Sequence, residues 1–438
     1  VRLRPEYGRR FFPTGPVDLK GSNDVLTRLR SDLWVDVRPH ETLRAFVKVR
    51  DVRDWGDEPS TVSTGTKDES TDLYEGYLEI IKPFDVPVKV RGGRQAIAHA
   101  NERLVGPLDW LNNGRSFDAA RLWVDGGGGD FANGAPGEWL LDGFFAQINE
   151  EPGPGDDDGY FGGALASVKI AAPVSFEAFT YVLTDGATSA PVAGTAGLGG
   201  GGEELTLWTS GGRVEWSVGD LKTGSAAQLK GDAFGAVQYG NFGPRRVEDA
   251  FAAYATVSAG VPLWEAASAW LGYEYSYGSG DNDPGDKKLS TFSNLFPTNH
   301  MYYGYMDLFS LQNLSHHQVG LAVIPCESVK IALDGHWFFL DEERDAWYRA
   351  TGAAVARDPS GRSSRDLGEE IDLTVWYTYN QYLKFMAGYS HFFPGTFARK
   401  VAQSGGAGAV SGNPALAANV KGFRDADWAY VQVLLAYP

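Results

Sequence analysis

Apolar and charged residues alternate almost without a break from Asp24 to Arg53, with one short turn in the middle. Successive side chains of a β-strand point to opposite faces, so this stretch predicts a hairpin with one apolar and one charged face. The same alternation recurs along the chain, and the connections between the runs are short and long in turn. An apolar outer face, a polar inner face and alternating turn lengths are typical of a transmembrane β-barrel. The sequence therefore predicts an all-β fold, with one antiparallel barrel over residues 1–438.

Alternating runs bounded by turn residues predict about 18 strands, with short periplasmic turns, long extracellular loops and both termini on the periplasmic side. Their predicted ranges are 2–10, 25–38, 43–53, 73–82, 87–95, 117–125, 138–149, 159–170, 175–184, 203–210, 229–240, 248–259, 267–277, 316–325, 328–340, 369–379, 382–393 and 426–436. The count stays open by one hairpin around 203–240. There, 211–228 is long where a short turn is expected, and 241–247 is short where a long loop is expected.

Composition and motifs limit the partners and the chemistry. The net charge of −17 argues against nucleic acid as a partner. No apolar run reaches the length of about 18 residues that a transmembrane helix needs. The single cysteine, Cys326, excludes an internal disulfide and a cysteine-based zinc site. The adjacent histidines His316 and His317 would point to opposite faces of a strand, so they do not form a shared site, and no enzyme activity is expected.

Several segments resemble the alginate export family of outer-membrane barrels. The segments are 279–286 (SGDNDPGD), 291–300 (TFSNLFPTNH), 303–308 (YGYMDL), 93–95 (GRQ), 109–110 (DW), 113–118 (NGRSFD), 368–373 (GEEIDL), 389–395 (YSHFFPG) and 427–430 (DWAY). The resemblance covers most of the chain and is most specific from about residue 270 to 430. It implies an 18-stranded barrel surrounded by outer-membrane lipid in a Gram-negative bacterium. The family's namesake exports the polyanion alginate through an arginine-lined constriction, but many relatives have no such role, so the resemblance implies the fold far more strongly than the substrate.

Basic residues gather on the predicted inward face of the N-terminal third. An arginine or lysine facing lipid costs roughly 2–4 kcal/mol at the bilayer midplane, so these side chains are expected to line the pore. They are Arg28, Arg30, Arg44, Lys48, Arg50, Lys89, Arg91, Arg94 and Arg121. The pattern favours an anion-selective wall. The alternative is a balanced lumen in which acidic side chains neutralise the wall, namely Asp32, Asp36, Glu75 and Glu79. Further candidate pore-lining acids come from the opposite part of the chain and predict a field across the pore: Glu274, Asp334, Glu370 and Asp372.

The connection 278–315 is too long for a simple turn and is rich in aromatic residues. It is expected to fold inward as a plug or constriction, with an external cap as the alternative. Within it, Asp281, Asp283 and Asp286 are candidate calcium ligands, although they lack the spacing of an EF-hand. Turns also use Asp, Asn and Gly for backbone reasons alone. No other cofactor is expected.

These features predict a passive outer-membrane channel for hydrophilic, anionic solutes or polysaccharide. The alternative is a structural barrel whose occluded lumen holds a periplasmic or outer-membrane partner protein. Large inward side chains favour a partly filled lumen; they are Trp34, Phe46, Trp123 and Trp376.

Overall fold

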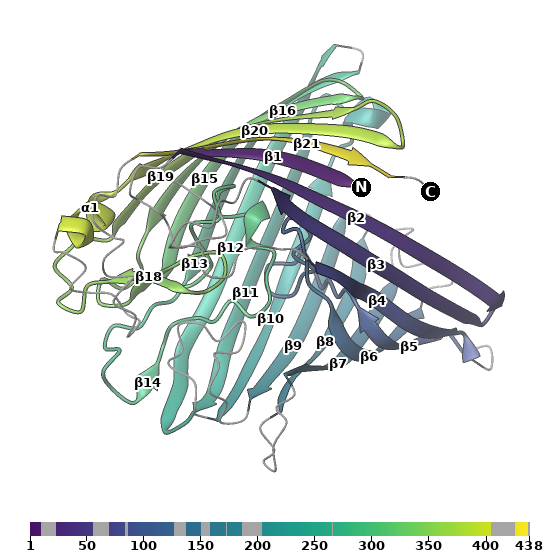
Figure 1. Cartoon of the computed structure of the whole chain (residues 1–438), viewed down its shortest axis with the longest axis horizontal. Helices are drawn as coiled ribbons and strands as arrows, with labels where there is room; N and C mark the ends of the chain where they lie inside the picture. Colours follow the sequence, from purple (N-terminus) through teal and green to yellow (C-terminus); the bar gives the residue numbers. More distant parts are fainter. Residues whose placement is uncertain are drawn as a thin grey trace.

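The computed structural model describes residues 1–9, 23–55, 70–83, 86–126, 137–149, 158–171, 173–185, 204–264, 266–403 and 425–436. Within them, eighteen antiparallel strands form one closed sheet, in which each barrel strand pairs with the one before and the one after it. The first strand also pairs with the last, so the sheet has no free edge. Figure 1 shows the strands running around a single barrel, with both termini at the same end. The predicted fold class is confirmed.

The barrel strands match the predicted ranges closely. They are β1 (Arg2–Arg9), β2 (Asn23–His40), β3 (Leu43–Trp55), β4 (Ser70–Ile81), β5 (Val88–Gln95), β6 (Phe117–Gly126), β7 (Trp139–Asn149), β8 (Gly159–Ala171), β9 (Val174–Asp185), β10 (Leu205–Val218), β11 (Gln228–Phe242), β12 (Arg245–Trp264), β13 (Ala267–Gly278), β15 (Leu314–Cys326), β16 (Val329–Phe339), β19 (Asp366–Thr378), β20 (Leu383–Pro394) and β21 (Ala426–Leu435). We call the end with the chain termini the short-turn end and the opposite end the loop end.

The ambiguous region around 203–240 resolves into two long strands. β10 continues to Val218, so the segment from Val214 extends this strand and does not form another. A turn with a 3₁₀ helix, η3 (Leu221–Thr223), then leads into β11. β11 and β12 are joined at the loop end by Gly243-Pro244, where Gly243 has a positive φ of 53° that glycine adopts without strain. This tight turn is where the alternation of short and long connections breaks.

Side chains alternate across the barrel wall as predicted. On β16, Ile331 and Leu333 are exposed on the outer face, whereas His336 is buried inside. The register pairs Leu333 with Leu373 and His336 with Glu370, so each face keeps its character from strand to strand. The outer rows of apolar side chains suit contact with lipid tails. No helix in the described part of the chain is long and apolar enough to cross a membrane.

Three long connections pack inside the barrel at the loop end. We call them the first inner loop (96–116), the second inner loop (279–313) and the third inner loop (340–365). Their short elements are β14 (Lys288–Leu289), η4 (Asn299–Met301), β17 (Ala346–Tyr348) and β18 (Ala354–Arg357), and α1 (Thr396–Gln403) follows β20.

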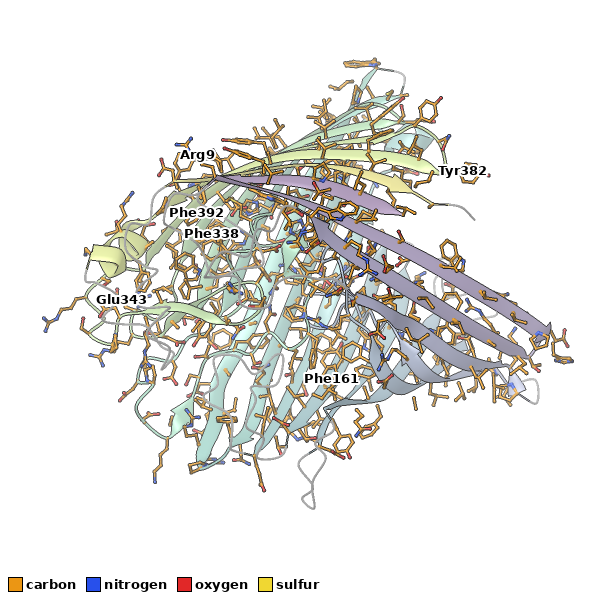
Figure 2. All side chains as sticks on the ribbon, viewed as in Figure 1. Arg9, Phe161, Phe338, Glu343, Tyr382 and Phe392 are labelled. Atoms are coloured by element: carbon orange, nitrogen blue, oxygen red, sulfur yellow. The ribbon has the colours of Figure 1, made fainter. Side chains whose placement is uncertain are left out.

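The hydrophobic core lies within the lumen, between these loops and the inward face of the wall. Phe292 and Phe309 of the second inner loop are fully buried, and so are the inward side chains Phe161 and Phe338. Figure 2 shows Phe161, Phe338 and Phe392 on strands of the wall that surround the loops. The inner face is therefore aromatic at the loop end, in contrast to the polar inner face expected from the sequence, because packed loops cover it there instead of water.

Candidate functional site

Eight of the nine predicted basic residues face the lumen, from β2, β3, β5 and β6. The alternation of side chains along each strand places them on the face opposite the apolar rows. The predicted acids Asp32, Glu75 and Glu79 face the same way from β2 and β4 and form ion pairs with them. We call the eight residues the basic wall: Arg28, Arg30, Arg44, Lys48, Arg50, Lys89, Arg91 and Arg121.

Arg94 lies on the outer face of the barrel, so its prediction as a pore-lining residue is wrong. Arg91 and Arg94 are three positions apart in β5, and an odd separation in a strand places two side chains on opposite faces. Arg94 instead forms an ion pair with Asp118 of β6, with 2.7 Å between Nη2 and Oδ2. This pair lies near the loop end of both strands, away from the middle of the membrane, where an outward charge is tolerated best.

Carboxylates on the basic wall are shared between basic side chains. Glu79 contacts Arg91 at 2.5 Å and Arg44 at 3.6 Å, so one acid serves two guanidinium groups. Lys89 forms no ion pair with any described carboxylate. The wall is therefore compensated locally by carboxylates that several basic side chains share. Further ion pairs join Arg28 to Glu6 and Asp54, Arg30 and Arg50 to Asp32 and Asp109, Arg44 to Asp36, Lys48 to Glu75, and Arg121 to Asp142. Apart from Arg28, Arg30 and Arg50, the wall has five basic side chains and four paired carboxylates, so one positive charge is in excess there; the basic residues are Arg44, Lys48, Lys89, Arg91 and Arg121, and the carboxylates are Asp36, Glu75, Glu79 and Asp142.

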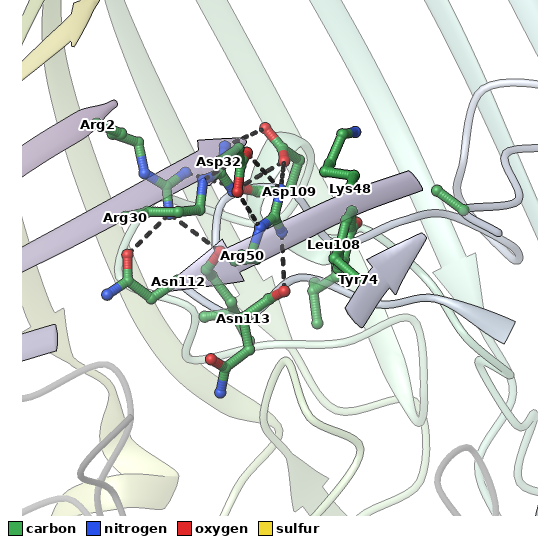
Figure 3. A network of polar contacts seen from close by, with 12 residues as sticks. Arg2, Arg30, Asp32, Lys48, Arg50, Tyr74, Leu108, Asp109, Asn112 and Asn113 are labelled. Carbon is green, nitrogen blue, oxygen red and sulfur yellow. Dashed lines mark hydrogen bonds and ion pairs between the residues drawn. The ribbon is translucent and has the colours of Figure 1, made fainter. Parts of the chain in front are cut away.

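Arginines of the wall hold the first inner loop in place (Figure 3). Arg2 of β1 donates a hydrogen bond of 2.7 Å to the carbonyl oxygen of Asp109, and Arg50 donates one of 2.8 Å to that of Asn113. Arg30 donates to both carboxylate oxygens of Asp109, at 2.9 and 3.2 Å. A guanidinium has five N–H donors, so one arginine can bind a wall carboxylate and a loop carbonyl at once. This part of the wall anchors a loop and does not line an open path.

Arg103 links the first inner loop to the opposite wall of the barrel, across the lumen. Its Nη2 lies 2.5 Å from Oε2 of Glu274 on β13, and its side chain is 2% exposed. The guanidinium packs over the rings of Tyr254 and Tyr302, at 3.9 and 3.8 Å from their centroids. Burial alone would lower the pKa of Arg103, but the Glu274 carboxylate and the surrounding tyrosines hold it above its ordinary value. Arg103 therefore stays charged and fixes the loop to this wall.

The second inner loop covers two of the predicted acids. The backbone N–H of Met306 donates to Oε1 of Glu370 at 2.9 Å, and that of Tyr305 donates to Oδ2 of Asp372 at 3.3 Å. His336 Nε2 lies 3.3 Å from the same Asp372 oxygen. Both carboxylates face the lumen, as predicted, but at 0% and 1% exposure they contact the loop and not an aqueous path.

The three inner loops also bind one another. Trp110 of the first loop stacks on His300 of the second, with ring centroids 3.9 Å apart. Arg115 of the first loop donates to the carbonyl oxygen of Pro297 at 3.2 Å, and burial lowers the pKa of Arg115 to about 10. Trp347 of the third loop donates to the carbonyl oxygen of Leu308 at 2.8 Å. The loops therefore form one packed unit inside the barrel.

The candidate calcium ligands mainly stabilise turns. Oδ1 of Asp281 accepts the backbone N–H of Asp283 at 3.0 Å, and Oδ1 of Asp286 accepts that of Lys288 at 2.6 Å. Asp281 also donates its own N–H to Asp345 of the third inner loop. Across the residues that the structure describes, no group of three or more His, Cys, Asp or Glu side chains is placed to hold a metal ion. The geometry therefore favours the backbone role of these aspartates.

Sequence reasoning did not identify the residues that fix the inner loops, chiefly Arg2, Arg103 and Asp109. Arg103 lies in an irregular segment, where the alternation of residue types cannot show which way a side chain points. The signal that was available is the length of 96–116, which is too long for a simple connector. A buried arginine in such a loop needs a carboxylate partner, and inward acids such as Glu274 supply one.

Solved structures of outer-membrane proteins from Pseudomonas aeruginosa share this fold. OpdK, solved with vanillate, has a TM-score of 0.55 and 11% identity, covering 99% of this chain and 96% of its own. OprD has a TM-score of 0.53 and 11% identity, covering 99% of this chain and 91% of its own. OccK11 has a TM-score of 0.52 and 12% identity, covering 100% of this chain and 95% of its own. These identities support the fold alone.

Among the curated proteins, none matches the chain in sequence. The family model described as alginate export matches residues 9–409, which is most of the chain. Together with the closed 18-stranded barrel, the match indicates an outer-membrane channel of a Gram-negative bacterium, with short periplasmic turns and long extracellular loops. The chain belongs to the alginate export family of outer-membrane β-barrel proteins.

Proposed function

We propose that this channel passes hydrophilic solutes passively and prefers anions, either small or polymeric. The observation that carries the proposal is the part of the basic wall on β3, β5 and β6, where Arg44, Lys48, Lys89, Arg91 and Arg121 outnumber their paired carboxylates by one. Arg44, Lys48 and Arg91 keep 19%, 23% and 15% of their side chains exposed inside the barrel. Partial exposure lets a passing anion meet these groups, and their ion pairs keep binding weak, as conduction requires.

Electrical recording of the purified protein in a planar lipid bilayer tests this function. With a KCl gradient across the membrane, we expect discrete conductance steps and a reversal potential displaced toward that of chloride. A reversal potential at zero, or one displaced toward potassium, would contradict the anion preference while leaving a pore in place.

Replacing Arg91 with glutamine is expected to lower the chloride-to-potassium permeability ratio by about twofold. One elementary charge about 8 Å from an ion in a water-like medium contributes roughly 0.5 kcal/mol, which corresponds to that ratio. Arg94→Gln is the matched control, since it removes the same charge three residues away but on the outer face. Equal shifts in both variants would show that the effect does not come from the lumen.

A second candidate function is that of an occluded scaffold, and the packing of the three inner loops favours it. The first inner loop reaches from the basic wall to Glu274 on the opposite wall, so it crosses the lumen. A barrel filled in this way could hold a partner protein without conducting. Stable insertion without conductance steps in the bilayer experiment would support the scaffold and contradict the channel proposal.

A further inference from the structure

A cavity of about 1500 Å³ lies inside the barrel toward the short-turn end. The described residues that line it fall between Asp220 and Trp376. They lie on strands β11 to β19, in the turns between these strands and in the turn that precedes β11, with Tyr305 of the second inner loop. The basic wall on β2–β6 contributes nothing to this lining. The cavity is therefore a separate part of the lumen, on the other side of the barrel from the residues discussed above.

Four acidic side chains line this cavity among the described residues, and three of them already accept a hydrogen bond or pair with an arginine; the fourth, Glu327, is exposed in the turn between β15 and β16. Glu274 pairs with Arg103 at 2.5 Å. Asp334 accepts a hydrogen bond of 3.0 Å from the side-chain amide of Gln318. Asp220 accepts a backbone N–H in its own turn. Among the described residues, neither Glu274 nor Asp334 forms an ion pair with a lysine of the cavity, and Asp334 acts on Lys330 only through the longer-range attraction of opposite charges.

Two lysines of the cavity are free to meet a ligand. Lys230 Nζ lies 4.8 Å from the ring centroid of Trp270, and Lys330 Nζ lies 4.6 Å from that of Trp376. Both lysines are exposed, and neither forms an ion pair with a described carboxylate. A cation–π contact at an exposed site is weak beside a charge-assisted hydrogen bond to a carboxylate. An arriving carboxylate would thus readily engage either ammonium group.

We propose that this cavity binds small organic anions that carry a carboxylate on a flat ring, that is, aromatic carboxylates. Each lysine supplies the charge for the carboxylate, and the neighbouring indole supplies an apolar surface for the ring that bears it. Pockets for small molecules commonly combine aromatic walls with a few placed polar groups in this way. A small inorganic anion would gain nothing from the indoles. The inference rests on the proposed function, since it names a solute class for the same channel.

Calorimetric titration of the purified full-length chain in a neutral detergent tests the site. The probes are benzoate, benzyl alcohol, which has the ring without the charge, and acetate, which has the charge without the ring. We expect benzoate to bind about tenfold more tightly than either of the others, a difference of roughly 1.4 kcal/mol. Equal affinity for the three probes would overturn the proposal.

Substitution of the two lysines tests whether benzoate binds in this cavity. The double variant Lys230→Gln/Lys330→Gln is expected to lose about tenfold in benzoate affinity with an unchanged thermal unfolding midpoint. Lys384→Gln on β20, a lysine outside the described lining of the cavity, is the control and should bind as the parent does. Unchanged affinity in the double variant would overturn the site.

The result is separable from that of the bilayer experiment. Lysine-dependent benzoate binding without conductance would support this site and contradict the channel. Anion-selective conductance without such binding would contradict this site alone.

Discussion

Arg103→Ala is expected to release the first inner loop from the opposite wall, at a local cost of about 3–5 kcal/mol. The substitution leaves the Glu274 carboxylate, which is 8% exposed, without its cation. It also removes the guanidinium between Tyr254 and Tyr302, which would then lose a contact on one face of each ring. Local opening is measured by hydrogen–deuterium exchange, because amide exchange reports the free energy of opening segment by segment. We expect the peptides that cover 96–116 to exchange much faster in the variant.

The double variant Arg103→Leu/Glu274→Leu separates the charge effect from a general loss of packing. Removing both members of a buried ion pair is commonly far less costly than removing one. We therefore expect the double variant to recover much of the protection that Arg103→Ala loses. Peptides from β15 and β16 serve as an internal control and should exchange as in the parent. Equal protection of the first inner loop in the parent and in Arg103→Ala would show that the pair does not hold it.

The barrel could be predicted from the sequence because a strand that faces lipid on one side alternates apolar and polar residues along its length. Ile331 and Leu333 alternate with Lys330 and Ala332, and that alternation alone fixes the face of every residue in β16. The same rule, applied strictly to β5, would have placed Arg94 outside, since it is an odd number of residues from Arg91. The error therefore came from grouping basic residues by type and not by position.

The contents of the lumen were not predictable to the same degree. Alternation shows that Arg50 points inward, but not that it donates to the carbonyl oxygen of Asn113. Likewise, it places Glu370 and Asp372 inside without revealing that the second inner loop covers them. Irregular loops have no period, so their course depends on contacts between residues far apart in the chain. The inward acids and the long loops were visible separately, and the structure shows that they bind each other.

Gly304→Ala is expected to lift the second inner loop from the wall and to increase conductance. Gly304 has a φ of +81°, and a Cβ atom there would lie 2.6 Å from a carboxylate oxygen of Glu370. Left-handed backbone costs a residue other than glycine roughly 1–2 kcal/mol, before the clash is counted. A change of that size shifts the ratio of lifted to docked loop by about 5- to 30-fold. Single-channel recording in a planar bilayer should then show larger or more frequent open steps than the parent.

Gly224→Ala provides the matched control for this variant. Gly224 also has a positive φ, 93°, but a Cβ atom built there meets nothing within 4 Å, and the residue lies in the turn between β10 and β11. An alanine at position 224 would therefore have the same left-handed backbone strain, but it would make no contact with Glu370. Increased conductance in Gly304→Ala alone would identify the docking of the second inner loop as the restriction on the pore. Identical traces from the two variants would mean that neither the backbone strain nor the clash with Glu370 at position 304 governs conduction.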